Sequence, residues 1–296
     1  MKIVITGASG MIGRALCADF RRDGHTVTRL VRRAPAAPDE RRWDPTGGAD
    51  PDLVSGADLV INLAGAGLAD RRWTAGYKRQ VMDSRVGSAR TLAEMITAAE
   101  RPPGRLLAMS GIRYYGVDRG DTELDEDAEP GHDGFLPEVT HAWDRETEGL
   151  PIPVGRLRVG LVLSRQGGLL PPLLSQFRFG LGGPLGSGRE FWSCVTLTDV
   201  VRAVRFLAEL PDAGGPYNVV APAPARSGDF ARELAAALHR PAALRYPTPL
   251  LRLLMGQMAA EVLASLRVVP RRLLDAGFRF EHPDLPTSVR HALNDG

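Results

Sequence analysis

The sequence predicts an α/β protein with a Rossmann fold, in which a doubly wound parallel sheet is joined to a smaller C-terminal α+β substrate lobe. Three observations support this fold class. The chain opens with a short apolar run that leads directly into a glycine-rich turn and a helix. Strand-like and helix-like segments then alternate to about residue 165, as in parallel sheets with right-handed crossovers. Beyond that point glycine and proline cluster and the alternation is lost.

The first part of the chain is expected to supply the main sheet and its helices. Short apolar or β-branched runs predict strands, and apolar residues at helical spacing predict helices. The expected strands are 2–6, 26–31, 57–64, 106–110 and 154–163, and the expected helices are 11–22, 74–99 and 136–149. Residues 34–55 and the acidic segment 118–134 are expected to be loops, the acidic one either solvated surface or a mobile lid.

The later part is expected to form the smaller lobe. Helices are predicted near 198–210, 228–239, 249–264 and 285–293, and short strands near 192–196, 217–220 and 243–246. We therefore expect a dinucleotide-binding domain over residues 1–165 and a substrate lobe over residues 166–296. Late strands of such proteins can return to the main sheet, which makes this boundary a soft one.

Composition and charge exclude several functional classes. With 296 residues, 44% of them hydrophobic and 24% charged, the chain is an ordinary globular protein rather than a disordered or fibrous one. The net charge is only +2 and the arginine pairs are spread along the chain, which argues against a nucleic-acid partner. No apolar run reaches the roughly 18–20 residues that cross a bilayer, which argues against a membrane partner.

Cysteine usage bears on metal binding and on cellular location. Cys17 and Cys194 are too few for a disulfide framework or a tetrahedral zinc site, so no metal is expected. Two isolated cysteines favour a reducing cytoplasm. The N-terminal run leads straight into the glycine turn and leaves no room for a signal peptide, which favours the same location.

The strongest local signal is Thr-Gly-Ala-Ser-Gly-Met-Ile-Gly at residues 6–13, which follows a strand and opens a helix. This is the context that a dinucleotide-binding turn requires. Gly7 permits the tight turn, Gly10 lets backbone approach a pyrophosphate, and Gly13 lets the helix pack closely on the sheet. The helix start, with Met11 and Ile12, offers free N–H groups to the phosphates.

The end of the second strand decides between the two nicotinamide dinucleotides. NAD binders place a carboxylate there for the ribose 2′-hydroxyl, whereas this chain has Arg32 and Arg33. A guanidinium can hold a 2′-phosphate through two hydrogen bonds. The sequence therefore predicts NADP(H), with Arg32 as the main contact and Arg33 or Ser9 assisting. The alternative is that Arg32 is an ordinary surface charge.

The next strand ends in Asn62-Leu63-Ala64-Gly65 at the same edge of the sheet. Its small residues would let a cofactor pass close to the backbone. Asn62 either takes part in that site or ties neighbouring strands together.

Several short motifs together resemble the SDR39U1/YfcH-like epimerase family, a group of atypical extended short-chain dehydrogenases/reductases. The resemblance extends over nearly the whole chain. Besides the glycine motif it rests on Asn62–Gly65, Arg72–Thr74, Ser84–Val86, Tyr114–Gly116, Ala142–Asp144, Gly180–Gly188, Asn218–Pro222, Val269–Leu273 and Gly277-Phe278. It implies a Rossmann fold, NADP(H), a C-terminal lobe of the family's own type, and cofactor contacts at Arg32, Leu63, Ala64 and Arg85.

The chain departs from the family pattern on the presumed substrate side. Cys194-Val195-Thr196 stands where Trp-Ile-His is usual, Asp144 where glutamate is usual, and Arg113 where a small residue is common. We therefore expect these differences to bear on the substrate rather than on the fold. The expected partner is a small molecule, and a homodimer is left open.

The acid–base pair of ordinary short-chain dehydrogenases is missing. Those enzymes use Tyr-x-x-x-Lys on one helix, where the ammonium lowers the pKa of the tyrosine so that the phenol exchanges a proton with a carbonyl. The only lysines here are Lys2 and Lys78, and Thr74 stands four residues before Lys78. Another group must supply the proton.

Three residues are candidates for that chemistry. Ser110 ends the strand where a catalytic serine usually lies, Tyr115 follows in the loop over the nicotinamide, and His141 lies on the helix that takes the place of the missing pair. Each has a structural alternative, because Tyr115 precedes a glycine turn and His141 fits an exposed helix surface.

Aromatic residues are expected to wall an apolar pocket for a hydrophobic carbonyl or enone, although core packing explains each of them as well. They are Trp73, Tyr114, Trp143, Phe179 and Trp192. Three functions then remain in view. The first is an NADP(H)-dependent oxidoreductase that transfers a hydride to or from a small carbonyl, alcohol or enone. The others are a non-catalytic, regulatory NADP(H) binder and an epimerase or isomerase that retains its cofactor.

Overall fold

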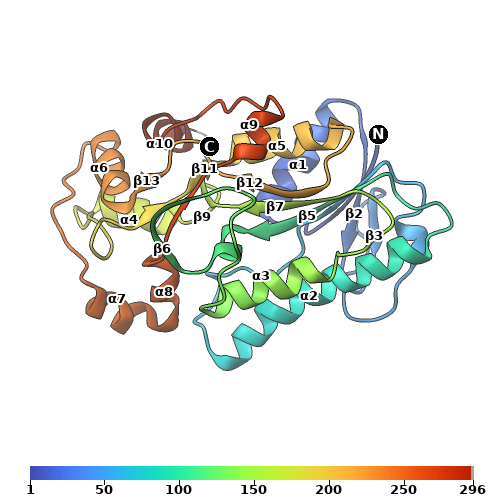
Figure 1. The fold of residues 1–296 in the computed structure, drawn as a ribbon, viewed down its shortest axis with the longest axis horizontal. Coiled ribbons are helices and arrows are strands. Elements are labelled where there is room, and N and C mark those ends of the chain that lie inside the picture. The colour runs from blue at the N-terminus through green and yellow to red at the C-terminus, as the bar shows by residue number, and fades with distance from the viewer. Residues whose placement is uncertain (295–296) are drawn as a thin grey trace.

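A seven-stranded parallel sheet forms the centre of the molecule (Figure 1). The structure is a computed structural model that describes residues 1–294. The strands lie in the order β3-β2-β1-β4-β5-β7-β12, and every pairing is parallel. Their bounds are β1 Lys2–Thr6, β2 Thr26–Val31, β3 Glu40–Arg42, β4 Leu59–Asn62, β5 Leu106–Gly111, β7 Val154–Val159 and β12 Gly215–Val219. The predicted Rossmann fold is confirmed.

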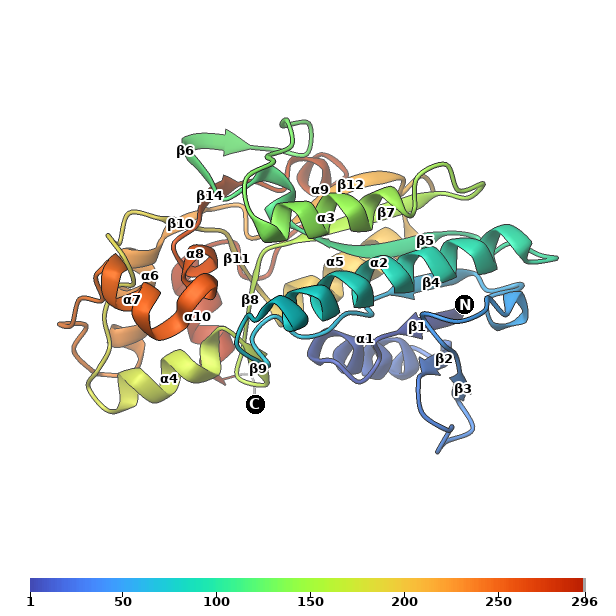
Figure 2. The ribbon, with the colours of Figure 1, turned by 90° about the horizontal axis from the view of Figure 1, so that it is seen from below.

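Helices cover both faces of this sheet. α1 (Met11–Arg22) and α5 (Leu197–Glu209) lie on one face, and α2 (Ala75–Ala98) and α3 (Phe135–Arg145) lie on the other (Figures 1 and 2). One apolar core joins α1 and α5 to the sheet, and another joins α2 to it. Because both faces are buried, the central strands are nearly continuous apolar runs, as the sequence predicted.

The segment 34–55, expected to be a loop, contains β3 and a short 3-10 helix at Pro51–Leu53. β3 escaped prediction because its three residues are Glu40, Arg41 and Arg42, with no apolar side chain. The strand lies at the edge of the sheet beside β2. Its Glu40 side chain is buried and neutralised by arginines rather than packed among apolar groups.

The acidic segment 118–134 was also wrongly expected to be a loop or a lid throughout. It begins with β6 (Asp118–Leu124), which pairs in parallel with β14 (Ser265–Val268). The partner strand and the residues after it are basic: Arg267 pairs with Glu123 at 3.2 Å, and Arg271 pairs with Asp125 at 2.9 Å. Because the oppositely charged partners lie some 140 residues apart in the sequence, no local pattern indicates that this acidic segment forms a strand.

The C-terminal lobe is built from short elements around a core that includes Phe177, Phe230 and Leu234. They are β8 Leu161–Ser164, β9 Gly167–Gly168, α4 Leu170–Arg178, β10 Phe191–Trp192, β11 Cys194–Thr196, β13 Ala225–Arg226, α6 Ser227–Ala237, α7 Thr248–Met255, α8 Ala259–Val262 and α10 Leu285–Asn294. The short helix α9 (Arg271–Asp275) instead packs against β12, and its Leu273 belongs to the core of the main sheet. The expected α+β lobe is present, with α4, α6, α7, α8 and α10 on one side of the molecule (Figure 2).

Two expectations for this lobe were wrong in detail, and one helix was not predicted. The helix expected at 249–264 is broken at Gly256, whose φ of +60° ends α7 before α8 begins. The strand expected at 243–246 is only a single bridge between Leu185 and Tyr246. The helix α4 was not predicted; it carries Pro171-Pro172 in its first turn, where proline is well tolerated.

The boundary at residue 165 describes the chain only in part. α5 and β12 come after it, yet both belong to the main sheet and its helix layer. One late strand, β12, thus lies at the edge of the main sheet. Much of the chain between and after these two elements forms the smaller lobe, but Leu273 and Phe278 pack in the core of the main sheet.

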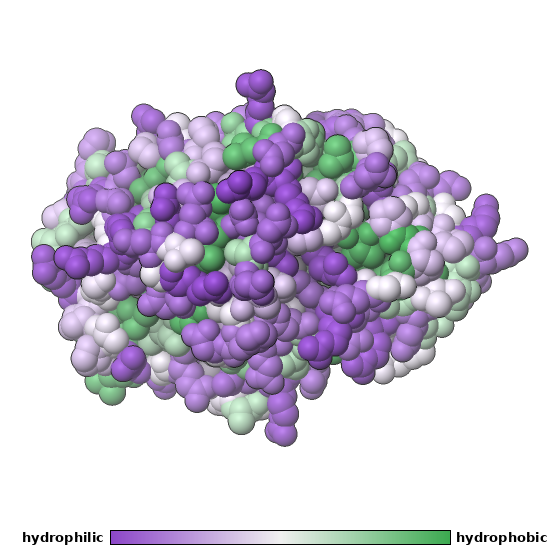
Figure 3. All heavy atoms as spheres, in the orientation of Figure 1, coloured by the Kyte–Doolittle hydropathy of each residue, from purple (hydrophilic) through white to green (hydrophobic). Residues whose placement is uncertain are grey.

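The surface gives no sign of a single large apolar face in the view of Figure 3, where hydrophilic side chains dominate and apolar ones form small scattered groups. Individual leucines such as Leu253 are nevertheless well exposed on α7. Within residues 1–294, no helix is both long and apolar enough to cross a membrane.

Candidate functional site

The glycine-rich turn lies at the point where the order of the sheet reverses, between β1 and β4. Gly7 has a φ of +64°, and a Cβ there would come within 2.5 Å of the Leu63 carbonyl oxygen. A Cβ on Gly13 would lie 2.7 Å from Cα of Ala8 and would also collide with the Gly7 carbonyl. Both positions thus require glycine, because the β1–α1 turn, the start of α1 and the end of β4 are in direct backbone contact.

The start of α1 is open to an anion. Gly10 is the N-cap and provides no side-chain cap, and the first turn of α1 contains no acidic residue. Gly10 N–H donates to the Gly7 carbonyl at 3.0 Å, which closes the turn beneath this end of the helix. Uncapped N–H groups and the positive end of the helix dipole attract phosphate, so Met11 and Ile12 lie where the sequence predicted phosphate contacts.

Asn62 ties the strands behind this turn together. Its Oδ1 accepts a hydrogen bond from Thr6 Oγ1 at 2.7 Å and from the Ala64 N–H at 3.2 Å. Thr6 Oγ1 in turn accepts from the Leu63 N–H at 3.1 Å. Of the two alternatives, the structure supports the strand-tying one. Leu63 and Ala64 are thereby held directly beside Gly7.

The two arginines after β2 differ in their surroundings. Arg33 donates two hydrogen bonds of 2.7 Å to the carboxylate of Glu40, and this pairing lowers the pKa of Glu40 to about 2. Arg32 is exposed and makes no hydrogen bond or ion pair with any residue between 1 and 294. The geometry therefore separates a free guanidinium, Arg32, from one that already holds a carboxylate, Arg33.

Arg85 lies on α2 facing the loop after β4. Its guanidinium is near Gly65, where a Cβ would lie 3.1 Å from Cζ, and 5.4 Å from the ring centre of Trp143. No carboxylate within the described chain pairs with it, and burial lowers its pKa to about 10. A half-buried cation without a counter-ion at the cofactor edge is consistent with the contact that the family resemblance implied.

Ser110 lies near the end of β5 and is buried. It lies close enough to the carboxyl of Asp144, on α3, to lower the pKa of that group. Yet neither Oγ of Ser110 nor Oδ2 of Asp144 has a hydrogen bond of acceptable geometry among the described residues. Burial outweighs the hydroxyl and raises the pKa of Asp144 above its ordinary value.

Sequence reasoning used Asp144 as a family marker but missed it as a functional residue. A signal was available, because Leu136, Thr140 and Trp143 already placed one face of the helix inward, and Asp144 lies on that face. Arg158 was missed as well. A charged residue in the middle of a buried strand rarely lacks a specific task.

Tyr115 is fully buried within the 3-10 helix Ile112–Tyr115. Its hydroxyl donates to Asn218 Oδ1 at 2.7 Å and accepts from Arg158 Nη1 at 2.9 Å. Burial raises its pKa to about 12. Both hydrogen-bonding directions of the phenol are thus occupied by protein, which favours a structural role. The predicted catalytic role of Tyr115 stays a prediction.

His141 lies on α3, half-buried. Its Nε2 donates to the Gly131 carbonyl at 2.8 Å, and its ring is 4.8 Å from that of Tyr114. Arg158, on β7, has its guanidinium 3.4 Å from the centre of the same Tyr114 ring. His141 is therefore tied to a loop rather than free on the helix surface, and its predicted role in proton transfer stays a prediction.

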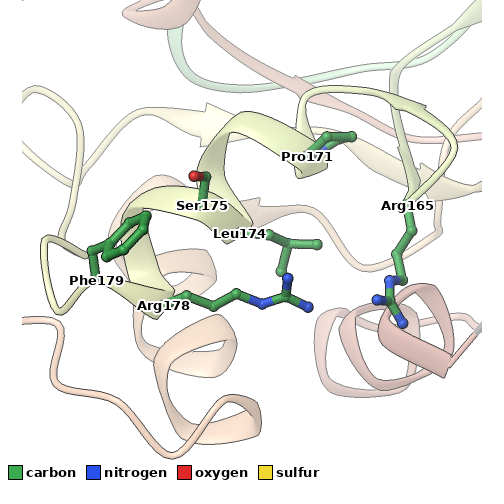
Figure 4. A pocket seen from close by; sticks show the side chains of 6 residues that line it. All are labelled: Arg165, Pro171, Leu174, Ser175, Arg178 and Phe179. Carbon is green, nitrogen blue, oxygen red and sulfur yellow. The ribbon is translucent and has the colours of Figure 1, made fainter.

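The structure does not gather the five predicted pocket aromatics around one site. Trp73 contacts Phe135 at the start of α3, whereas Trp192 is packed in the core of the C-terminal lobe. Phe179 is 80% exposed and lies beside a hollow of about 410 Å³ on α4 (Figure 4). The sequence could not separate these roles, because aromatic residues serve cores and pockets alike. Tyr114 and Trp143 remain at the β5–α3 edge.

Two segments of the chain match known families. Residues 3–134 match the NAD dependent epimerase/dehydratase family, and residues 246–292 match DUF1731, a domain of unknown function. An epimerase family protein of Mycobacterium bovis is 37% identical over 297 residues, which covers 98% of this chain and 97% of that protein. The epimerase family protein SDR39U1 of Bos taurus is 34% identical and covers 99% of this chain and 100% of its own length.

A solved structure has nearly the same fold. The crystal structure of human epimerase family protein SDR39U1 (isoform2) with NADPH matches with a TM-score of 0.90 and 31% identity. The match covers 99% of this chain and 100% of that one, so it includes the C-terminal lobe as well as the sheet.

Proposed function

The chain belongs to the epimerase family of SDR39U1-like proteins, and from this premise we propose that it is an NADP(H)-dependent oxidoreductase of the extended short-chain type. It transfers a hydride between the nicotinamide and a small organic carbonyl, alcohol or enone. The human relative was crystallised with NADPH, which supports the same cofactor here.

The observation that carries the proposal is the uncapped start of α1 at the switch point of the sheet. Parallel α/β sheets bind ligands at this point, beyond the carboxyl ends of the strands. Gly7 and Gly13 bring backbone close together there, and no side chain caps the helix. These residues fit a pyrophosphate, with Gly10, Met11 and Ile12 around it.

The second supporting observation is the free guanidinium of Arg32. It follows β2, at the position that distinguishes the phosphorylated from the unphosphorylated ribose. Arg33 is held by Glu40, so we assign the 2′-phosphate to Arg32, with Ser9 beside it on the glycine turn. Arg85 has no counter-ion and adds a second cation at the cofactor edge.

For the hydride transfer, bound NADPH supplies the hydride, and the chain must orient the carbonyl and deliver a proton. Ser110 lies near the carboxyl end of β5, where its hydroxyl can donate to the oxygen of a carbonyl. No Tyr-x-x-x-Lys pair is available, since Lys78 lies on α2 and interacts with Gln257 and the ring of Phe135.

The test is NADPH oxidation in the presence of a carbonyl panel that contains aromatic and aliphatic aldehydes, ketones, quinones and enones. We expect at least one class of carbonyl to give saturable turnover. We expect no turnover with Gly13→Val, because the added side chain would collide with the glycine turn and disrupt the proposed pyrophosphate site. NADPH binding without turnover of any class would contradict the proposal.

NADPH binding without turnover would favour a regulatory NADP(H) binder. The absence of the tyrosine–lysine pair is the specific argument for that function. A substrate isomerised without net consumption of NADPH would favour an epimerase that retains its cofactor.

A further inference from the structure

Buried polar atoms without partners are concentrated at one place in the described chain, between β5, β7 and α3. Eight buried side-chain atoms of residues 1–294 lack a hydrogen bond. Five of them belong to these three elements: Ser110 Oγ, Trp143 Nε1, Asp144 Oδ2, Arg156 Nε and Arg158 Nε. Buried polar groups are normally satisfied, so an unsatisfied group calls for a ligand, a water or a functional explanation.

Ser110 and Asp144 are brought together by the packing of α3 on β5. Ser110 pairs with Arg158 in the register of β5 and β7, so both side chains lie on the sheet face that α3 covers. Asp144 lies on the buried face of that helix. The hydroxyl and the carboxyl therefore meet near the carboxyl edge of the sheet.

The charges around Asp144 are mainly positive. The charged groups that act on its carboxyl are Arg156 and Arg158 on β7 and His141 on α3. Burial raises the pKa of Asp144, and it outweighs the lowering effect of the Ser110 hydroxyl, Arg158, Arg156 and His141. No cation lies within 4 Å of its carboxylate among the described residues, so the carboxyl is not locked into an ion pair.

Resting on the proposed function, we propose that Asp144 is a positioning residue that acts through Ser110. The carboxyl of Asp144 orients the Ser110 hydroxyl, and it gives Ser110 a new proton after Ser110 has donated its own to the substrate. The two residues together thus do the work of the missing tyrosine and lysine. Asp144 does not touch the substrate; Ser110 does.

The proton and electron balance of the step is complete. The substrate carbonyl carbon accepts the hydride of NADPH, and the electron pair of its C=O π bond moves to the oxygen. That oxygen takes the proton of the Ser110 hydroxyl, Ser110 takes the proton of the Asp144 carboxyl, and water reprotonates Asp144. NADP⁺ and an alcohol result. The carboxyl of Asp144 must therefore be protonated before each reduction.

The first experiment needs no substrate. Protein labelled with ¹³C at the aspartate carboxyl is titrated by NMR, and the Asp144 signal is identified by its loss in Asp144→Asn. We expect a titration midpoint above that of an ordinary aspartate, and a further increase in Ser110→Ala, because the hydroxyl favours the charged carboxylate. The control is Asp199, which is buried on α5 on the opposite face of the sheet and should not respond to Ser110→Ala.

A merely structural carboxyl would titrate independently of Ser110. An Asp144 signal that Ser110→Ala leaves unmoved overturns the pairing. If Asp144→Asn does not fold, Asp144→Glu identifies the signal instead, because it keeps the acid and displaces it by one methylene.

The second experiment measures the pH profile of kcat/KM for a carbonyl that the panel identifies. Reduction requires the protonated carboxyl, so the rate should fall as the pH rises through the Asp144 pKa. Asp144→Asn should lose about 100-fold or more, since general acid catalysis contributes on that order. Asp144→Asn should also remove the fall of kcat/KM with rising pH, and Asp144→Glu should restore part of the lost rate. The NADPH affinity of both variants should stay within a few-fold of that of the unchanged protein.

The two proposals fail in different ways. An unchanged profile in Asp144→Asn overturns the role of Asp144 and leaves the oxidoreductase in place. If no member of the panel is reduced, the oxidoreductase fails, and the NMR titration still decides whether Ser110 and Asp144 are coupled.

Discussion

The cofactor half of this molecule and the half that we propose to take the substrate are built in different ways. Around the cofactor, backbone groups from residues close in sequence make the site, and glycines allow them to approach one another. On the substrate side, the contacts are made by side chains from distant segments, such as Arg113 with Glu261 and Tyr115 with Asn218. A local motif thus specifies the first site, whereas only the folded chain specifies the second.

The largest expected effect is on the cofactor half, with Gly13→Val. The added side chain would collide with the Gly7 carbonyl and Ala8 and force α1 away from the turn. We expect NADPH affinity to fall by more than about 100-fold and the free energy of unfolding to fall by about 1–3 kcal/mol, typical of overpacking. Fluorescence titration and urea unfolding measure the two.

The matched control is Gly24→Ala. Gly24 also has a positive φ, +76°, but no atom lies within 4 Å of a Cβ placed there. It should cost about 1 kcal/mol of stability through backbone strain alone and leave NADPH affinity unchanged. Equal losses of NADPH affinity in Gly13→Val and Gly24→Ala would contradict the proposed pyrophosphate site at the start of α1.

On the substrate half, the largest effect is expected from Arg113→Ala. Arg113 Nε lies 2.8 Å from the Glu261 carboxylate, and burial raises the pKa of Glu261. Removing the guanidinium leaves a buried carboxylate without its partner, which should cost about 3 kcal/mol near neutral pH. The deficit should shrink as the pH falls and Glu261 becomes protonated, while NADPH affinity stays the same.

Arg226→Ala is the control, because its ion pair with Asp121 is exposed and worth less than about 1 kcal/mol. If Arg113→Ala weakened NADPH binding as strongly as it weakened stability, the two halves would not be independent.

Arg32→Glu tests the cofactor half without disturbing the fold. Loss of a charge-assisted contact of about 2–3 kcal/mol should weaken NADPH binding by about 30- to 150-fold, and NADH binding far less. Arg41→Glu, an exposed change on the neighbouring β3, should leave both affinities unchanged. An NADPH affinity that survives Arg32→Glu would show that the 2′-phosphate lies elsewhere.

The smallest effect is expected from Tyr115→Phe. It removes the hydroxyl that joins Arg158 to Asn218, which should cost about 1–2 kcal/mol of stability. Turnover measured below the unfolding temperature should stay within a few-fold. A loss of about 100-fold would restore Tyr115 as a catalytic acid.

This contrast also explains how far the sequence could be interpreted. β1, α1 and β2 were predicted with their observed bounds, because periodicity, a glycine turn and a helix stop all lie within thirty residues. β6 and Asp144 could not be assigned in the same way. β6 pairs with a strand some 140 residues away. A role for Asp144 can be inferred only from the folded chain, in which α3 brings its carboxyl close to Ser110. Arg33 matched the expected pattern locally, yet the edge strand β3 supplies the Glu40 that holds it.

The preference for NADP(H) can be measured by titrating the purified protein with NADPH and with NADH and following nicotinamide fluorescence. We expect saturable binding of NADPH, with an affinity at least about tenfold above that for NADH, which corresponds to about 1.4 kcal/mol for the 2′-phosphate contact. Absence of saturable binding for both dinucleotides, or an equal affinity for the two, would contradict it.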